Sequence, residues 1–227
     1  MADANPRTIV VLETGGPATM PWLSKVATVL EAWYPGTELG NAIAGVLFGD
    51  ANPSGHLPIT FPVSEADLPT AGSPLQQSDT SAELRYSEGL KIGYRWYDSQ
   101  KIAPLFPFGF GLSYTTFKYS GLSVSGNPRN GATVRFTVTN TGGRSGADVA
   151  QVYVRFPQTA GEPPRQLKGY RRVSLAPGAS AQLAISLDRR AFSYWDPAFR
   201  AWTVASGCYG ISAGNSSRSL PLSGQVC

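Results

Sequence analysis

The 227-residue sequence predicts a small α/β unit followed by an all-β sandwich. In residues 1–68, strand-like apolar runs alternate with segments of helical spacing, in the order β-α-β-α-β, which favours a partial parallel sheet. In residues 117–227, short alternating strands are separated by turn signals about every 8 to 12 residues, which is typical of an immunoglobulin-like β-sandwich. Residues 69–116 are predicted to join the two parts as an aromatic connection rich in glycine and proline.

Five short elements make up the predicted α/β unit. In chain order they are a strand at 8–12, a short helix at 21–28, a strand at 29–34, a helix at 38–48 and a strand at 57–61. The first strand is uniformly apolar, as a buried parallel strand requires. Pro21 suits a first helical turn and Gly49 suits a helix C-terminus. Three strands in about 60 residues are marginal alone, so we expect more chain, another subunit or the second half to cover the sheet.

The connection divides into two stretches. Residues 64–88 are polar and rich in turn residues, which predicts a long loop. Residues 86–117 are rich in aromatic side chains and glycine. A stretch of that composition is expected to pack against folded structure, because so much exposed apolar surface is unfavourable.

The sandwich is predicted from the alternation of apolar and polar residues between turn signals such as Asn140-Thr141-Gly142-Gly143 and Ala176-Pro177-Gly178. The expected strands are 118–124, 133–139, 148–155, 168–175, 182–187, 201–205, 209–213 and 219–222.

Charge and hydropathy argue against two classes of partner. The net charge is +4 and the pI is about 9.1, but the basic residues are scattered and form no stripe of the kind that binds nucleic acid. No apolar run approaches the roughly 18 residues of a membrane span. The first residues lack the basic-then-apolar pattern of a signal peptide.

Cys208 and Cys227 lie close together in the glycine-rich C-terminal part. We favour a disulfide, which would close a loop of about 20 residues and contribute roughly 3 kcal/mol in the chain-entropy model. Such a bridge would imply an oxidising compartment. The alternative is two unrelated free thiols.

His56 is the single histidine, so any histidine-dependent catalysis depends on it. A serine hydrolase would need a nucleophile beside it, and the candidates are Ser54 and Ser212, the latter in a G-x-S-x-G run. We favour a solvated or turn-capping role for His56, and a β-strand rather than a nucleophile elbow for residues 210–214. A lone histidine and two distant cysteines give no zinc-ligand spacing, so we expect neither a metal nor a cofactor.

Carboxylates and aromatic residues offer a second kind of chemistry. Glu13 and Glu38 follow the first two predicted strands, where the carboxyl ends of parallel strands place ligand groups. The simpler interpretation of Glu38 is an acid in the first turn of a helix. The rings of Trp33, Tyr34 and Trp96 suit stacking on sugars, although packing between the two halves is the interpretation that we favour.

Several ordered motifs resemble the C-terminal portion of the family 3 glycoside hydrolases, the family of β-glucosidases and β-xylosidases. TIVVLETGGPATMPW, EAWYPG and GNAIAGVLFGDANPSGHLPITFP, within residues 8–62, resemble the later part of that family's α/β-sandwich domain. SEGLKIGYRWYD and LFPFGFGLSYTTF resemble the connection that follows it. VTNTGGRSGADVAQVYV, QLKGYRRVSLAPGAS and GISAGNSSRSLPL resemble its fibronectin-III-like domain.

The resemblance implies retaining hydrolysis of terminal β-linked sugars through a glycosyl-enzyme intermediate, in a secreted or periplasmic parent protein. The family's aspartate nucleophile lies in a barrel domain, and its acid/base glutamate lies upstream of the segment that matches residues 8–12. Neither role falls on a residue of this sequence. Thr37 and Leu39 also depart from the family pattern, which puts substrate contacts of this loop in doubt.

Three hypotheses follow. The first is the non-catalytic scaffold portion of a β-glucosidase-like hydrolase, with aromatic contacts to a carbohydrate ligand. The second is a stand-alone ester hydrolase that uses His56. The third is a carbohydrate-binding or interaction module. Because a truncated sheet leaves open edges, we also expect self-association or a barrel-bearing partner chain. The sequence does not specify the sugar.

Overall fold

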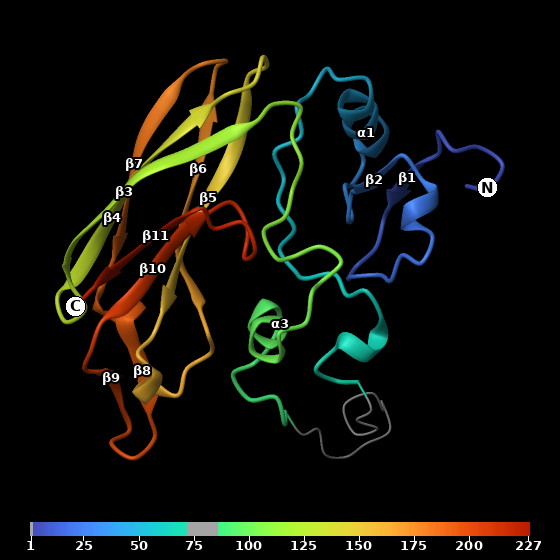
Figure 1. Cartoon of the computed structure of the whole chain (residues 1–227). Helices are drawn as coiled ribbons and strands as arrows, with labels where there is room; N and C mark the ends of the chain where they lie inside the picture. The colour runs from blue at the N-terminus through green and yellow to red at the C-terminus, as the bar shows by residue number, and fades with distance from the viewer. Residues whose placement is uncertain (1, 72–85) are drawn as a thin grey trace.

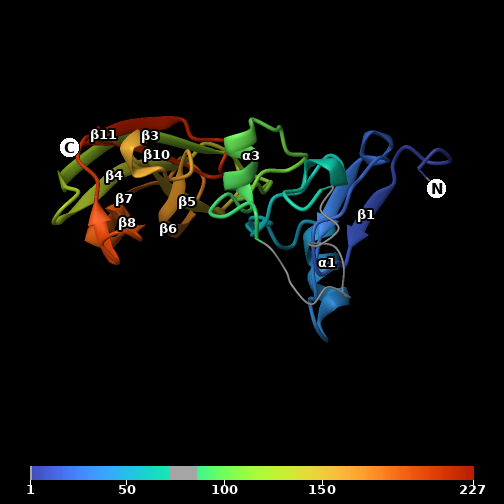
Figure 2. The ribbon, with the colours of Figure 1, turned by 90° about the horizontal axis from the view of Figure 1, so that it is seen from below.

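The computed structural model describes residues 2–71 and 86–227, and contains a small α/β part and a β-sandwich with a helical connection between them (Figure 1). Turned by 90°, the molecule shows the sandwich and the α/β part at opposite ends, with α3 between them (Figure 2). The expected combination of a parallel α/β part and an antiparallel sandwich is therefore confirmed.

The sandwich consists of two antiparallel sheets. One has the order β3-β4-β7 and the other has the order β11-β10-β5-β6. The strands are β3 (Phe117–Asn127), β4 (Gly131–Asn140), β5 (Gly146–Arg155), β6 (Gln166–Leu175), β7 (Ser180–Leu187), β10 (Tyr209–Gly214) and β11 (Leu222–Val226). Single turns of 3-10 helix, η3 (Gln158–Ala160) and η4 (Arg189–Phe192), lie between strands.

Every second side chain along the strands points inward, and these buried side chains form the core of the sandwich. Val134, Phe136 and Val138 of β4 are fully buried, whereas the residues between them are half-buried or exposed. The facing sheet contributes the buried side chains Val152 and Val154 of β5. The strand at 219–222 was predicted too early, because β11 begins at Leu222. β8 (Ser193–Asp196) and β9 (Ala201–Val204) form a hairpin, of which the sequence predicts only the second strand, at 201–205.

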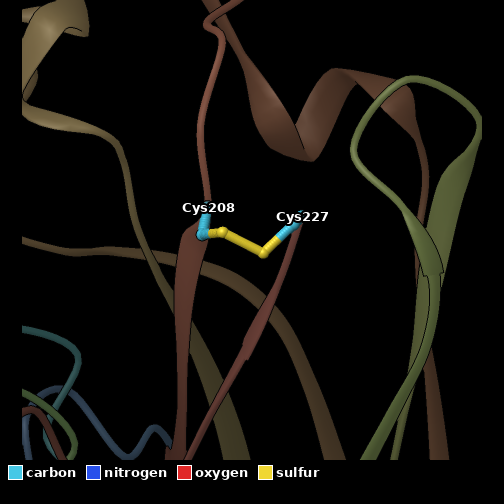
Figure 3. The surroundings of a disulfide bond; sticks show 2 residues. All are labelled: Cys208 and Cys227. Atoms are coloured by element: carbon cyan, nitrogen blue, oxygen red, sulfur yellow. A yellow bond between two sulfur atoms is a disulfide. The ribbon is translucent and has the colours of Figure 1, made fainter.

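The disulfide joins Cys208 and Cys227 (Figure 3). These residues lie just before β10 and just after β11, which pair from Tyr209 with Val226 onward. The bridge therefore closes the end of this strand pair.

The α/β part has two parallel strands, β1 (Ile9–Leu12) and β2 (Thr28–Glu31), paired over four residues. The predicted first helix is a single 3-10 turn, η1 (Leu23–Lys25). The predicted second helix is confirmed as α1 (Leu39–Leu47), and Gly49 follows it with a φ of +83°. No residue of α1 is fully buried, because two strands cannot cover its apolar face.

The predicted third strand, residues 57–61, is wrong. Pro58 and Pro62 offer no N–H groups, and the segment pairs with the connection instead of the parallel sheet. Leu57 N donates to Phe110 O, Gly109 N donates to Leu57 O, and Phe61 and Phe106 form an antiparallel bridge. In Figure 1 the two segments run side by side between α1 and the sandwich.

The connection packs against folded structure, as expected, and contains two elements that the sequence did not predict. The turn η2 (Glu65–Asp67) is capped by Ser64, whose N–H donates to Asp67 Oδ2 at 2.9 Å. The helix α3 (Tyr94–Gln100) docks on the sandwich. Much of the predicted polar loop, residues 72–85, lies outside the described residues.

Asp98 holds α3 on the sandwich. Its carboxylate is only 2% exposed and accepts two hydrogen bonds from Arg165, at 2.7 and 3.0 Å. Arg218 Nη2 lies 3.2 Å from the same carboxylate. Tyr94 Oη also accepts a hydrogen bond from Leu167 N at 2.7 Å. The connection is therefore fixed by polar contacts as well as by its aromatic rings.

We predict that Asp98→Asn lowers the free energy of unfolding by about 2 kcal/mol, since it leaves two arginines beside a neutral amide. This loss of stability is smaller than the loss expected on breaking a fully buried ion pair, because both arginines are about a third exposed. Urea unfolding measures it, with Asp50→Asn at an exposed site as the matched control. Equal midpoints for the two variants would contradict the role of Asp98.

Candidate functional site

A buried polar cluster lies where the α/β part meets the sandwich. His56 ends the Asn52-Pro53-Ser54-Gly55-His56 corner, and its side chain is only 10% exposed. Its Nε2 lies 2.9 Å from Asp148 Oδ1, on β5. Tyr119 Oη, on β3, donates to Asp148 Oδ2 at 2.8 Å. Of the two roles expected for His56, solvated or turn-capping, the solvated one is wrong, because the side chain is largely buried.

Both ring nitrogens of His56 face groups that only accept hydrogen bonds. Nδ1 lies 3.2 Å from the backbone oxygen of Ser54, and Nε2 faces the Asp148 carboxylate. Neither nitrogen faces a serine hydroxyl, so this geometry does not provide a general base for a serine nucleophile.

Asp148 is a buried carboxylate with a full set of donors. Its side chain is 4% exposed and also accepts from Val149 N at 3.0 Å. Burial raises the pKa of the Tyr119 phenol, and the charge of Asp148 and the hydrogen bond to it raise it further. Tyr119 is therefore a neutral hydrogen-bond donor to Asp148.

Asn52, at the start of the same corner, makes a second connection. Its Nδ2 donates to Ser145 O at 2.9 Å, which links it to the start of β5. Its Oδ1 accepts from Ser113 Oγ at 2.9 Å and from Tyr114 N at 2.7 Å. The corner is thus held at both ends by hydrogen bonds to segments far away in the sequence.

Neither candidate nucleophile is positioned to react with His56. The hydroxyl of Ser54 accepts from Arg172 Nη2 at 3.3 Å. Ser212 lies within β10, opposite Tyr153, and Tyr153 is five residues along β5 from Asp148. That separation is about 16 Å at strand spacing. The G-x-S-x-G run is a strand without an elbow, so the geometry does not favour an ester hydrolase.

The second candidate region is at the carboxyl ends of β1 and β2. Glu31 ends β2, and its carboxylate accepts from Trp33 N at 3.0 Å and lies 3.3 Å from Thr14 Oγ1. Trp33 has a φ of +53°, a strained conformation for a non-glycine residue. Its ring packs against Phe61 at a centroid distance of 6.1 Å. Glu31 therefore ties together the two loops that leave the strands.

Tyr34 and Glu38 complete this edge. Tyr34 is 79% exposed and crosses the loop after β1, where a Cβ at Gly15 would lie 2.3 Å from the Tyr34 hydroxyl. Glu38 occupies the N-cap position of α1 and accepts from Asn41 Nδ2 at 2.6 Å. Glu13, which directly follows β1, is exposed. Each of the two hydrogen-bonded carboxylates, Glu31 and Glu38, holds a local turn, and the exposed ring of Tyr34 is available for contact.

Trp96 does not belong to this edge. It lies on α3, is half-buried and donates from Nε1 to Asp67 O at 2.9 Å. Its ring therefore packs within the connection. A sugar-facing role is not supported for Trp96.

Within residues 2–71 and 86–227, no group of three His, Cys, Asp or Glu side chains is arranged to hold a metal ion. In the same part of the chain, no helix is both long and apolar enough to cross a bilayer.

Sequence reasoning missed Asp148 and Tyr119. One signal was available: Asp148 interrupts an otherwise apolar run of inward-facing residues in β5, where an acid requires a partner. Which partner it would have could not be read from the sequence, because His56 is more than ninety residues away.

Two family models match the chain, one over the α/β part and the connection and the other over the sandwich. Residues 1–114 match the glycosyl hydrolase family 3 C-terminal domain, and residues 148–217 match a fibronectin type III-like domain. The chain belongs to glycosyl hydrolase family 3.

The relatives are β-glucosidases. The chain is 44% identical over 213 residues to a β-glucosidase of Rhizobium radiobacter, which covers 92% of the chain and 26% of that protein. It is 41% identical over 230 residues to thermostable β-glucosidase B of Acetivibrio thermocellus, which covers 100% of the chain and 30% of that protein.

Among solved structures, DesR, a β-glucosidase from Streptomyces venezuelae in complex with D-glucose, has a TM-score of 0.95 and 43% identity. The match covers 99% of this chain and 29% of that one. The chain thus spans between a quarter and a third of the length of these relatives.

We predict that His56→Ala lowers the free energy of unfolding by about 1–3 kcal/mol, because the buried Asp148 carboxylate loses the imidazole that contacts it. Ser54→Ala, a matched change in the same corner, should cost less than about 0.5 kcal/mol. Both variants should hydrolyse nitrophenyl acetate at the wild-type rate. A loss of ester hydrolysis in His56→Ala with unchanged stability would contradict the structural role.

Proposed function

We propose that these 227 residues are a non-catalytic scaffold portion of a β-glucosidase-like hydrolase. The observation that carries the proposal is that the chain matches between a quarter and a third of the length of β-glucosidases, in their C-terminal portion. The catalytic groups expected from the family resemblance fall on no residue of this sequence. The carboxylates at the strand ends support this proposal, since Glu31 and Glu38 accept local hydrogen bonds.

The partner we propose is the barrel-bearing catalytic part, on the same or a separate polypeptide. The α/β part exposes large apolar side chains that a water-facing surface does not need. Tyr34 is 79% exposed, Phe48 is 84% exposed and Val63 is 56% exposed. Exposed apolar surface of this kind marks interaction sites. A carbohydrate ligand would then contact Trp33 or Tyr34 at the rim of a site built mainly by the partner.

Self-association is the competing way to cover the same surface. The second copy would use the open edges of the two-stranded sheet. Light scattering on the purified chain separates the two. A dimer that Phe48→Asp dissociates favours self-association, and a monomer favours the barrel-bearing partner.

We also infer a secreted or periplasmic location. The Cys208–Cys227 disulfide supports it, because such bridges persist in oxidising compartments.

We predict that the purified chain releases no nitrophenol from nitrophenyl β-D-glucoside. A chimera in which this chain replaces the matching quarter of the Rhizobium radiobacter β-glucosidase should hydrolyse the same substrate, since the two chains are 44% identical over the 213 matched residues. Turnover by the chain alone, persisting through an orthogonal purification, would overturn the proposal.

Two matched variants of the chimera test the docking surface. Phe48→Asp places a charge on the exposed α/β face and should reduce activity at least several-fold. Phe199→Asp, at a 79% exposed position of the β8–β9 hairpin, should leave activity unchanged. Equal activity of the two variants would contradict the proposed surface.

A further inference from the structure

The loop that follows β2 contains a strained residue. Trp33 has a φ of +53°, in the left-handed region that bulky residues rarely adopt. The other non-glycine residues with a positive φ in the described part of the chain have ordinary places: Lys101 is the C-cap of α3, and Arg200 lies in the turn between β8 and β9. Strain of this kind persists only where neighbouring groups hold it, and it is concentrated at active sites and ligand clamps.

The carboxylate of Glu31 is the group that holds Trp33. Glu31 is the last residue of β2, and its Oε1 accepts a hydrogen bond from Trp33 N at 3.0 Å. Its Oε2 lies 3.3 Å from Thr14 Oγ1, in the loop that follows β1. The Trp33 ring packs against Phe61 at a centroid distance of 6.1 Å. Glu31 therefore fixes the direction in which the chain leaves the sheet.

Tyr34, the next residue, is restrained on both sides and yet exposed. Pro35 restricts the backbone of the residue before it to extended conformations. Gly15, in the neighbouring loop, leaves room for the Tyr34 hydroxyl, because any side chain at that position would meet it. The Tyr34 side chain is nevertheless 79% exposed. A ring on a restrained backbone loses little conformational entropy when a ligand binds, which favours binding.

The loop lies where ligands bind in open α/β sheets. β1 and β2 are parallel, so the loops that follow them leave the same edge of the sheet (Figure 1). Ligands of such sheets bind outside the carboxyl ends of the strands. A tyrosine offers an apolar ring face to a pyranose and a hydroxyl to the polar edge of the sugar. The position and the chemistry of Tyr34 therefore both suit a sugar.

We propose that Tyr34 contacts the glucoside in the site that the barrel completes, and that Glu31 positions Tyr34 by holding Trp33 at a positive φ. The inference rests on the proposed function, because the chain meets a glucoside only as part of a β-glucosidase-like hydrolase. Trp33 is half-buried against Phe61, so Tyr34 is the ring that faces the sugar. The contact is made by the bound substrate as well as by the transition state, so its loss raises KM and leaves kcat unchanged.

The test of Tyr34 uses the chimera with the Rhizobium radiobacter β-glucosidase and nitrophenyl β-D-glucoside as substrate. Tyr34→Ala should raise KM several-fold and leave kcat within about twofold, whereas Tyr34→Phe, which keeps the ring, should raise KM less. Tyr86→Ala removes another exposed tyrosine, with 73% exposure, and should change neither constant. An active chimera in which Tyr34→Ala leaves KM unchanged contradicts this inference alone. An inactive wild-type chimera contradicts the proposed function, and the inference with it.

Two substitutions separate positioning by Glu31 from a general role in folding. Glu31→Ala removes the acceptor and should raise KM of the chimera about as much as Tyr34→Ala does. Glu31→Gln keeps an oxygen that can accept from Trp33 N, so KM should return close to the wild-type value. Glu65→Ala, which removes an exposed carboxylate of the same part of the chain, should have no effect.

Hydrogen exchange in the purified chain measures the positioning without catalysis. The Trp33 amide should exchange at least about tenfold faster in Glu31→Ala than in Glu31→Gln, because only the first variant leaves this N–H without its acceptor. Equal exchange rates, or equal KM values, for the two variants contradict the role of Glu31.

Discussion

The contact on which the arrangement of the chain depends is the buried carboxylate of Asp148. A carboxylate in this position must be paired, since an unpaired buried charge costs several kcal/mol. Tyr119 supplies one donor from the sandwich itself, and the imidazole of His56 contacts the other carboxylate oxygen from the α/β part. The corner at 52–56 completes the set of partners of this buried acid, so the contact helps to fix where the α/β part sits.

The connection strengthens the same arrangement by similar physics. Asp98 of α3 is paired with Arg165 and Arg218 of the sandwich, as Asp148 is paired with His56. Both contacts are polar and directional, whereas the α/β part buries few apolar side chains of its own, chiefly Met20 and Phe61. A part with so small a core depends on its docking contacts for order. This explains how a fragment of a parallel sheet keeps a defined position beside the sandwich and presents its apolar face outward.

The sequence predicts what local pattern controls. The alternation at Val134, Phe136 and Val138 predicts a sandwich strand, and the apolar run at β1 predicts a parallel one. The segment 57–61 shows the limit: it looks like a third strand, but Pro58 and the backbone of Phe106 decide its pairing. The Asp148–His56 contact depends on partners far away in the chain, and no local pattern specifies it. The serine candidates failed for the same reason, since G-x-S-x-G has the sequence of an elbow without its strand-to-helix context.

Native-state hydrogen exchange, with and without Asp148→Asn, tests the central claim most directly. The amide of Leu57 donates to Phe110 O, next to the His56 corner, so it reports on docking of the α/β part. We predict that its opening free energy falls by at least about 1 kcal/mol in the variant, while the amides of the sandwich strand β4 exchange as in the wild type. If the Leu57 amide exchanges equally in both proteins, the buried carboxylate does not hold the two parts together.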